Sequence, residues 1–440
     1  MMKKILFTAF IIGAICKMAL AQDFDKARLD SYFNALDASN KFMGSVAVSQ
    51  NGKIIYSRST GFSDFENQIK ADANSKYRIG SISKTFTTVL VLKAVEEKKL
   101  ELSQTIDKYF PSIKNADKIT IENLLQHRSG IHSFTNDKDY LTWNTQARTE
   151  KEMIDIIANG GSDFEPGSKS EYSNSNFVLL TFILEKTFRQ PYSELLRKYI
   201  TQPVGLDNTF LGGKINTSKF ECRSYKYMDT WKAEPETDIS IPMGAGGIVS
   251  TPVDLVKFSD ALFGGKLLKT ESLELMKTVN GQYGMGMFKI PFFDLTGYGH
   301  TGGIDGFSSV FSYFSDGNIS YSMTCNGSNY NNNNISIAVL SAVFNKPYDI
   351  PEFKRFEVSP EELDKYLGVY SSTQIPIKIT VSRENNTLVA QGTGQAPFPL
   401  EATAKDKFKF ELAGIVMEFN PESKTMILKQ GGGQFTFTKE

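Results

Sequence analysis

The order of strand-like and helix-like segments constrains the fold of this chain more than any other feature. Strand patterns surround Asn51-Gly52, a pair that favours tight β-hairpin turns, and they return only after a long helical stretch. This order predicts an α+β domain, in which helices flank an antiparallel sheet and an all-helical insertion separates the two halves of the sheet. The strand-like runs are 44–49, 53–57, 298–300, 307–314 and 319–324, and the helical patterns are 84–99, 119–126, 151–159, 174–188 and 251–263.

We assign the α+β domain to residues 22–345. The residues after it have a different sequence pattern. Tyr330 and the asparagines 331–334 are interpreted as an exposed loop tip. Residues 346–362 are interrupted by prolines and are predicted to form a linker. Over residues 363–440, short alternating runs separated by turns predict a small all-β barrel or sandwich. These runs are 377–381, 387–391, 408–412, 415–419, 426–428 and 435–437.

The segment from Ser81 to Lys84 is the only Ser-x-x-Lys in the chain, and it opens a strongly apolar helical run. A serine hydroxyl is a weak nucleophile until a neighbouring group takes its proton. Residues three apart lie on one face of a helix, so Lys84 is expected within reach of the Ser81 oxygen. Burial would lower the pKa of Lys84, and a neutral amine is a usable base. We therefore predict Ser81 as a nucleophile at a helix N-terminus, where backbone N–H groups favour negative charge.

The first residues have the pattern of a secretory signal peptide. Lys3 and Lys4 precede an apolar stretch over residues 5–16, and Ala19-Leu20-Ala21 follows. The apolar stretch is short for a membrane-spanning helix, so we predict cleavage after Ala21 and no integral membrane segment afterwards. The sequence therefore predicts a periplasmic or secreted protein.

The charge balance argues against two classes of partner. The chain holds 49 basic and 49 acidic residues, and loss of Lys3, Lys4 and Lys17 with the leader leaves 46 basic residues against 49 acidic ones. A mature chain with a small negative net charge is not expected to bind nucleic acid or an anionic membrane.

The few cysteines and histidines do not have the spacing of a metal site. Cys222 and Cys325 remain after cleavage; export would permit a disulfide, but their wide separation offers no support for one, and two buried thiols are preferred. The histidines are His127, His132 and His300, and no His-Glu-x-x-His or paired Cys-x-x-Cys occurs. We predict no metal and no cofactor, and we interpret His127 and His132 as structural.

Two further segments carry side chains that could act together with Ser81 and Lys84. Tyr172-Ser173-Asn174 follows a Pro-Gly turn and opens a helix, and the segment His300 to Gly303 closes a glycine-rich strand. With the Ser-x-x-Lys, they match in order and spacing the three elements of the serine β-lactamase and penicillin-binding protein superfamily. The Tyr-x-Asn variant resembles class C β-lactamases and the related D-alanyl-D-alanine carboxypeptidases, D-aminopeptidases and esterases. The resemblance covers residues 30–345, and the C-terminal domain resembles lipocalin-like barrels that are often appended to exported members.

The resemblance implies how the reaction would proceed. Ser81 would attack a carbonyl to form an acyl-enzyme, and Lys84 and Tyr172 would share the proton handling, with the identity of the base left open. A cationic Lys84 would lower the pKa of the Tyr172 phenol, so Tyr172 as a phenolate stabilised by Lys84 is plausible.

The resemblance also implies how the substrate would be held. Asn174 would hold Lys84 and the substrate amide, and His300, Thr301 and Gly302 would line the substrate site. The backbone N–H groups of Ser81 and Gly303 would form the oxyanion hole.

One position departs from most of the superfamily. His300 stands where most members carry a lysine, and a histidine is only partly charged near neutrality, so a substrate carboxylate would be attracted less strongly. We expect an exported serine hydrolase that acts on a small-molecule or peptide substrate with an acyl bond: a D-amino-acid peptidase, carboxypeptidase or esterase. A true β-lactamase is the first alternative, and a non-catalytic protein that binds peptidoglycan or a partner is the second.

Overall fold

The computed structural model describes residues 24–228, 230–279, 282–353 and 356–440. The predicted leader over residues 1–21 lies outside these ranges, so its cleavage stays a prediction. Within the described ranges, the chain has no helix whose length and apolar character would let it pass through a bilayer.

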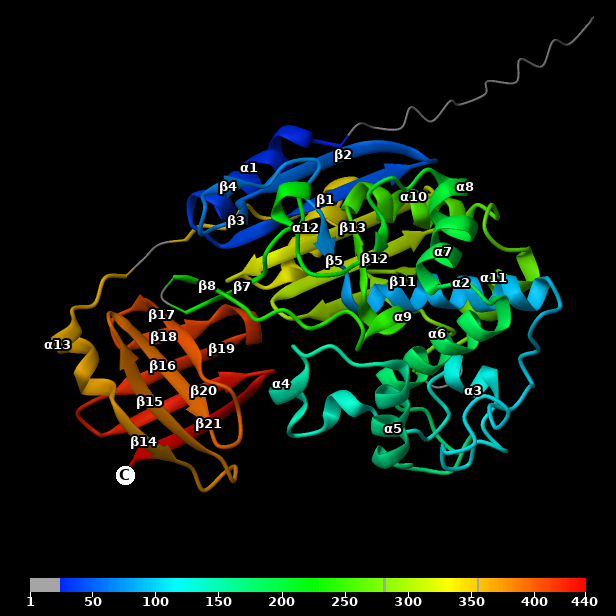
Figure 1. Cartoon of the computed structure of the whole chain (residues 1–440). Helices are drawn as coiled ribbons and strands as arrows, with labels where there is room; N and C mark the ends of the chain where they lie inside the picture. The colour runs from blue at the N-terminus through cyan, green and yellow to red at the C-terminus, as the bar shows by residue number, and fades with distance from the viewer. Residues whose placement is uncertain (1–23, 229, 280–281, 354–355) are drawn as a thin grey trace, which may run out of the picture.

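A six-stranded antiparallel sheet forms the centre of the larger part of the molecule (Figure 1). Its strand order is β10-β11-β12-β13-β1-β2, so strands from the two ends of this region lie side by side. β1 pairs with β13, with Val46 opposite Met323, and with β2 through the Asn51-Gly52 turn. This arrangement confirms the predicted α+β class, with helices inserted between the two halves of the sheet. The strands are β1 (Phe42–Gln50), β2 (Lys53–Thr60), β10 (Phe288–Phe292), β11 (Leu295–Ile304), β12 (Phe307–Phe314) and β13 (Ile319–Ser328).

Helices cover both faces of this sheet, and each face has its own apolar core. On one face, α1 and α12 bury Phe33 and Tyr321 in a shared cluster. On the other face, α2 and α10 pack together, and the rings of Phe86 and Phe258 stack with their centroids 3.8 Å apart. Burial on all sides explains why α2 is apolar almost all round. The four helices are α1 (Lys26–Ala38), α2 (Ser83–Glu96), α10 (Pro252–Phe263) and α12 (Asn332–Val343).

The helical insertion and several short strands complete this domain. Residues 175–184 of α6 are all buried, so this helix forms the centre of the insertion. The Thr251 side chain caps α10 by accepting the Asp254 N–H, and Pro252 lies in the first turn of this helix. The remaining helices are α3 (Ile121–Leu125), α4 (Tyr140–Trp143), α5 (Glu150–Gly160), α6 (Asn174–Phe188), α7 (Tyr192–Leu196), α8 (Gln202–Val204), α9 (Met243–Gly246) and α11 (Thr270–Lys277). The short strands are β3 (Phe62–Asp64), β4 (Ile69–Lys70), β5 (Tyr77–Arg78), β6 (Phe210–Leu211), β7 (Tyr225–Tyr227), β8 (Trp231–Ala233) and β9 (Ile248–Ser250).

The prediction of an exposed loop tip at residues 331–334 is wrong. These asparagines begin α12: the Asn331 side chain accepts a hydrogen bond from the Asn333 N–H at 2.9 Å, and Tyr330 is buried. Asparagine is a favoured N-cap residue, so a run of asparagines can start a helix as well as form a loop. The apolar residues that follow hold this helix on the sheet.

The C-terminal residues form a closed barrel of eight antiparallel strands, so the fold is a barrel and not a sandwich (Figure 1). Buried residues such as Val381, Met417 and Phe437 alternate with more exposed ones and form a separate core. The sequence pattern does not predict β14 and β17. A 3-10 turn from Glu411 ends β18 earlier than the predicted run 408–412. The elements are α13 (Pro360–Leu363), β14 (Gly368–Ser371), β15 (Lys378–Glu384), β16 (Thr387–Gly392), β17 (Phe398–Ala404), β18 (Lys407–Phe410), β19 (Ile415–Asn420), β20 (Thr425–Gln430) and β21 (Gly433–Lys439).

The two cysteines of the described chain are separate, buried thiols. Cys222 and Cys325 are each about 1% exposed and form no disulfide. Burial raises the pKa of both thiols, so neither carries the thiolate that reactive cysteines need. The preferred interpretation of two buried thiols is confirmed.

β11 approaches the residues before α2 so closely that it leaves no room for a side chain. A Cβ added to Gly302 would lie 2.0 Å from the Ile79 carbonyl oxygen, and one added to Gly80 would lie 2.7 Å from the Gly303 nitrogen. The Ser309 hydroxyl donates to the same Ile79 carbonyl at 2.8 Å. The absence of side chains therefore sets the spacing between the sheet and the start of α2.

We predict that Gly302→Ala destabilises the protein, because the added methyl group would collide with backbone atoms. Overpacking of this kind typically costs about 1–3 kcal/mol. Gly303→Ala is the matched control, since the nearest atom to a Cβ there is the Phe307 carbonyl oxygen at 3.9 Å. Equal unfolding midpoints for the two variants in differential scanning calorimetry would contradict the close approach.

Candidate active site

Ser81 lies in a single 3-10 turn, η1 (Gly80–Ile82), directly before α2. The chain enters this turn from β5, and Gly80 has a φ of +49°, in the left-handed region that favours glycine. The turn leaves Ser81 partly exposed, while the helix residues after it are buried. Ser81 is therefore presented at the start of a buried helix, as the sequence pattern predicts.

The Lys84 amine is fully buried and contacts three acceptors. Its Nζ lies 3.0 Å from Ser81 Oγ, 2.7 Å from Asn174 Oδ1 and 2.7 Å from the Ala245 carbonyl oxygen. None of these groups is an anion, and burial lowers the pKa of Lys84 well below its usual range. The structure thus brings Ser81, Lys84 and Asn174 together and adds a carbonyl of α9 that the sequence pattern does not single out.

The hydrogen-bond geometry fits a neutral Lys84 amine. The Ala245 carbonyl can only accept, and so can Asn174 Oδ1, whose orientation is set because Nδ2 of the same amide donates to Thr135 Oγ1 at 2.9 Å. A neutral amine has two N–H donors, which serve these two acceptors, and one lone pair. That lone pair then faces the Ser81 hydroxyl. In this state Lys84 is placed to accept the Ser81 proton, which is the task of a general base.

Tyr172 stands beside the same amine, with Lys84 Nζ 4.8 Å from the centre of its ring. Burial raises the pKa of Tyr172, and its hydrogen bond with the Ser81 side chain offsets this only in part. The expectation that Lys84 lowers the pKa of Tyr172 is therefore wrong. The directions of these pKa shifts favour Lys84 over Tyr172 as the group that takes the proton.

His127 lies closer to Tyr172 than its interpretation as a structural residue suggests. Its ring stacks on the Tyr172 ring, with centroids 4.4 Å apart, and its Nδ1 accepts the Ser173 N–H at 3.1 Å. Burial lowers the pKa of His127 well below its usual range, so the ring is neutral. His127 therefore packs against the Tyr-x-Asn segment through its ring and one hydrogen bond. His132 instead pairs with the carboxylates of two aspartates.

Asn174 is oriented by a short segment of the insertion. Its backbone N–H donates to Ser133 Oγ at 3.0 Å, and its side-chain amide donates to Thr135. The sequence pattern does not single out Ser133 or Thr135, because their partner lies about forty residues away. Their two hydroxyl groups, two residues apart in the sequence, are the one signal that could have indicated them.

His300 is buried, and its Nδ1 lies 2.5 Å from the Thr301 carbonyl oxygen, to which it donates its proton. Burial lowers the pKa of His300 to about 3, and a protonated Lys84 would act in the same direction. The expectation of a partly charged histidine is therefore wrong, and the ring is neutral at physiological pH. The other ring nitrogen, Nε2, is left as an acceptor.

Of the predicted site residues on β11, the His300 side chain faces the site and the Thr301 side chain faces away from it. Side chains alternate along a strand, and His300 lies on the face of the core around α2. Thr301 pairs with Val310, which packs against the core around α1 and α12. The Thr301 side chain therefore lies on the face away from Ser81, and only its backbone reaches the site. The Gly303 nitrogen lies beside the nucleophile turn.

Two aromatic residues that the sequence pattern does not single out line the site. The Tyr283 ring lies 5.7 Å from the Tyr172 ring and 5.2 Å from the His127 ring, measured between centroids. The Phe288 ring lies 4.8 Å from the His300 ring. Both residues are half-buried, so they give the site a partly open aromatic wall.

Comparison with known proteins decides the family. A family model described as Beta-lactamase matches residues 29–345. The chain belongs to this Beta-lactamase family. Over its greater length it is similar to penicillin-binding protein 4* of Bacillus subtilis (strain 168), with 24% identity over 450 residues that cover 93% of this chain and 97% of that protein.

Two relatives of this family member are named for hydrolysis of D-amino acid derivatives. The chain is 30% identical over 232 residues to the teichoic acid D-alanine hydrolase of Staphylococcus aureus, which covers 52% of this chain and 55% of that protein. The crystal structure of a D-amino acid amidase from Ochrobactrum anthropi SV3 superposes with a TM-score of 0.62 and 25% identity, covering 71% of this chain and 99% of that one. With the family model, these relatives identify a β-lactamase-related serine hydrolase.

We predict that Lys84→Arg abolishes acylation, because a guanidinium does not give up its proton in proteins. Loss of a general base costs about 10²- to 10⁴-fold in rate. In the wild type, kcat/KM should rise with pH as Lys84 loses its proton, and it should level off well below the pH at which an ordinary lysine titrates. Lys93→Arg, in the last turn of the same helix, is the control. An arginine variant within tenfold of the wild type would exclude Lys84 as the base.

Proposed function

We propose that this chain is an exported serine hydrolase that cleaves D-amino-acyl amides or esters through an acyl-enzyme on Ser81. The observation that carries the proposal is the buried Lys84 amine, whose Nζ lies 3.0 Å from Ser81 Oγ and whose hydrogen-bond partners in the described part of the chain include no anion. Ser81 Oγ would bond to the substrate carbonyl carbon while its proton passes to Lys84. The N–H groups of Ser81 and Gly303 would hold the carbonyl oxygen as it gains charge.

The second half of the reaction needs a proton for the leaving group. The departing amine or alcohol would take a proton from Lys84 or from Tyr172, whose raised pKa keeps its phenol protonated. The proton that Lys84 took from Ser81 would thus leave with the departing group, directly or by way of the Tyr172 phenol, so that Lys84 is neutral again. A water would then attack the ester carbonyl on Ser81 while Lys84 takes its proton, and Lys84 would return that proton to Ser81 Oγ as the D-amino acid leaves.

The neutral state of His300 supports a substrate without a carboxylate next to the scissile bond. Its pKa of about 3 removes the charge that a lysine in this position would supply. Lys84 is the amine found beside Ser81, Tyr172 and His300 in the described part of the chain. Its N–H donors are already bonded to Asn174 and Ala245, so they are not available to a substrate carboxylate. Penicillins and C-terminal peptides carry a carboxylate, whereas amides and esters of D-amino acids do not.

The names of the relatives agree with this substrate class. One is a teichoic acid D-alanine hydrolase and the other a D-amino acid amidase. The leader pattern of residues 1–21 supports export, which would bring the enzyme to cell-wall material.

The proposal is tested by exposing the protein to D-alanine methyl ester, L-alanine methyl ester and a chromogenic cephalosporin, with product release and intact mass as readouts. We expect the D-ester to be turned over fastest and a fluorescent penicillin to label Ser81 slowly. Ser81→Ala should lose turnover by about 10⁴-fold or more and should not be labelled.

Ser83→Ala is the control for this experiment, because the Ser83 hydroxyl accepts the Ile248 N–H and faces away from the chemistry. Labelling that survives Ser81→Ala would remove Ser81 from the mechanism. Faster turnover of the cephalosporin than of the D-ester would instead identify a β-lactamase.

We predict that His300 does not make substrate choice pH-dependent. Because burial keeps its pKa at about 3, the ratio of kcat/KM for a carboxylated ester to that for its neutral analogue should stay flat between pH 5 and 8. His300→Gln, which is neutral at every pH, should give the same flat ratio. A wild-type ratio that falls as pH rises through 6 to 7 would show that His300 carries charge.

A further inference from the structure

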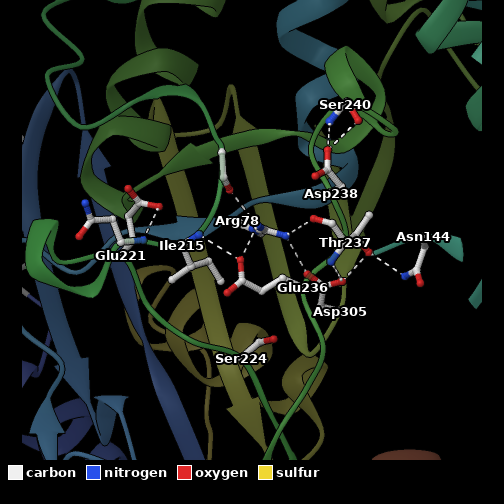
Figure 2. A network of polar contacts seen from close by, with 12 residues as sticks. Arg78, Asn144, Ile215, Glu221, Ser224, Glu236, Thr237, Asp238, Ser240 and Asp305 are labelled. Atoms are coloured by element: carbon white, nitrogen blue, oxygen red, sulfur yellow. Dashed lines mark hydrogen bonds and ion pairs between the residues drawn. The ribbon is translucent and has the colours of Figure 1, made fainter. Parts of the chain in front are cut away.

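Arg78 and Asp305 form a buried ion pair beside the site (Figure 2). Arg78 Nη1 donates to Asp305 Oδ2 at 3.0 Å, and both side chains are 2% exposed. Arg78 lies three residues before Ser81, and Asp305 lies two residues after Gly303. The pair therefore joins the two chain segments whose N–H groups would form the oxyanion hole.

The neighbours of this pair satisfy most of its hydrogen bonds, and Arg78 Nε is the guanidinium nitrogen left without a partner among the described residues. The Thr237 N–H and hydroxyl both donate to Asp305 Oδ1, at 3.0 and 2.6 Å, and Asn144 Nδ2 donates to Thr237 Oγ1 at 2.9 Å. Arg78 also donates to the carbonyls of Thr237 and Gly213, at 2.7 and 2.9 Å. Figure 2 shows Asp305, Glu236 and Thr237 around the Arg78 guanidinium, with Glu236 Oε2 3.3 Å from Arg78 Nη2. Such bonds offset the cost of removing two charges from water.

The spacing between the two segments depends on what anchors them, because no side chain separates them. Gly80 and Gly303 lie in direct backbone contact. On one side of this contact the Ser309 hydroxyl holds the Ile79 carbonyl at 2.8 Å. On the other side, the ion pair joins the two segments directly, and the Gly306 N–H also donates to Ser224 Oγ at 3.1 Å.

The Asp305 carboxylate is not needed to form its own turn. Asp305 and Gly306 make a two-residue link between β11 and β12, with Ile304 paired to Phe307, and Asp305 has a φ of +51°. Asparagine adopts this left-handed backbone at least as readily as aspartate, so the carboxylate charge is not what allows the turn. The buried carboxylate therefore acts on the docking of the turn against β5 and not on the turn itself.

We propose that the Arg78–Asp305 pair is a positioning element of the oxyanion hole. It holds the Gly303 N–H and the Ser81 N–H at the separation at which both reach one carbonyl oxygen. This inference rests on the proposed function, because it concerns the same acylation step. Arg78 and Asp305 do not touch the reacting atoms and act through the backbone.

The test compares a neutral p-nitrophenyl ester with its thiono counterpart, in which sulfur replaces the carbonyl oxygen. Sulfur accepts hydrogen bonds weakly, so a well-formed oxyanion hole favours the oxygen ester and a loosened one favours it less. Deletion of one oxyanion donor costs about 10²- to 10³-fold, so a displaced donor in Asp305→Asn should cost about 10- to 100-fold on the oxygen ester. The thionoester rate should fall less, so the oxygen-to-sulfur ratio should drop at least about fivefold.

This ratio does not depend on how much of a variant folds, since both rates scale with the active fraction. Arg78→Lys serves as a second variant that keeps the charge but has one nitrogen where arginine has a planar fork. Asp64→Asn is the matched control, since the Asp64 side chain is also 2% exposed and its partners are Asn67, Arg223 and Tyr225 and not Arg78 or Asp305.

The expected result is a lowered ratio in Asp305→Asn and Arg78→Lys and a wild-type ratio in Asp64→Asn. Equal losses on both esters in the two site variants would overturn the inference and leave a merely structural pair, while the proposed function would stand. A wild type without Ser81-dependent ester turnover would show instead that the proposed function fails.

Discussion

The burial of Lys84 without an acidic partner is the constraint on which the site depends. An amine in this position loses its hydration, and the groups around it are a hydroxyl, an amide oxygen and a backbone carbonyl. This loss of hydration favours the neutral amine, which is the form that can take a proton. A carboxylate beside Lys84 would instead hold the charged form, so the proposed role of this lysine as a base depends on its uncharged surroundings.

The rest of the domain serves to bring uncharged groups to that amine from distant parts of the chain. Pairing of β1 with β13 joins the two halves of the sheet, and β11 of this sheet lies against the start of α2. The insertion supplies Tyr172 and Asn174 from the opposite side, and α9 supplies a carbonyl. Glycines at the contact between β11 and the nucleophile turn let the two backbones meet, and polar anchors on either side then set their separation.

Sequence patterns predicted a large part of this arrangement, and they failed for identifiable reasons. Ser81 and Lys84 are three residues apart on a helix, so their proximity follows from local geometry. The start of α12 was missed because asparagine favours both loops and N-caps. The protonation state of His300 does not follow from the sequence, because its pKa depends on burial. The strand pattern does not predict how far a single residue of β11 is buried. Ser133, Tyr283 and the Ala245 carbonyl were missed because only long-range packing brings them to the site.

Local sequence alone determined the nucleophile turn, the apolar helix behind it, the α+β order of elements and the alternating strands of the C-terminal domain. Each of these follows from the period and the backbone preferences of neighbouring residues. The tertiary structure decided which groups are charged, which face of β11 meets Ser81, and that the barrel closes. Desolvation and backbone contact are properties of residues far apart in the chain, and they exist only once the chain has folded.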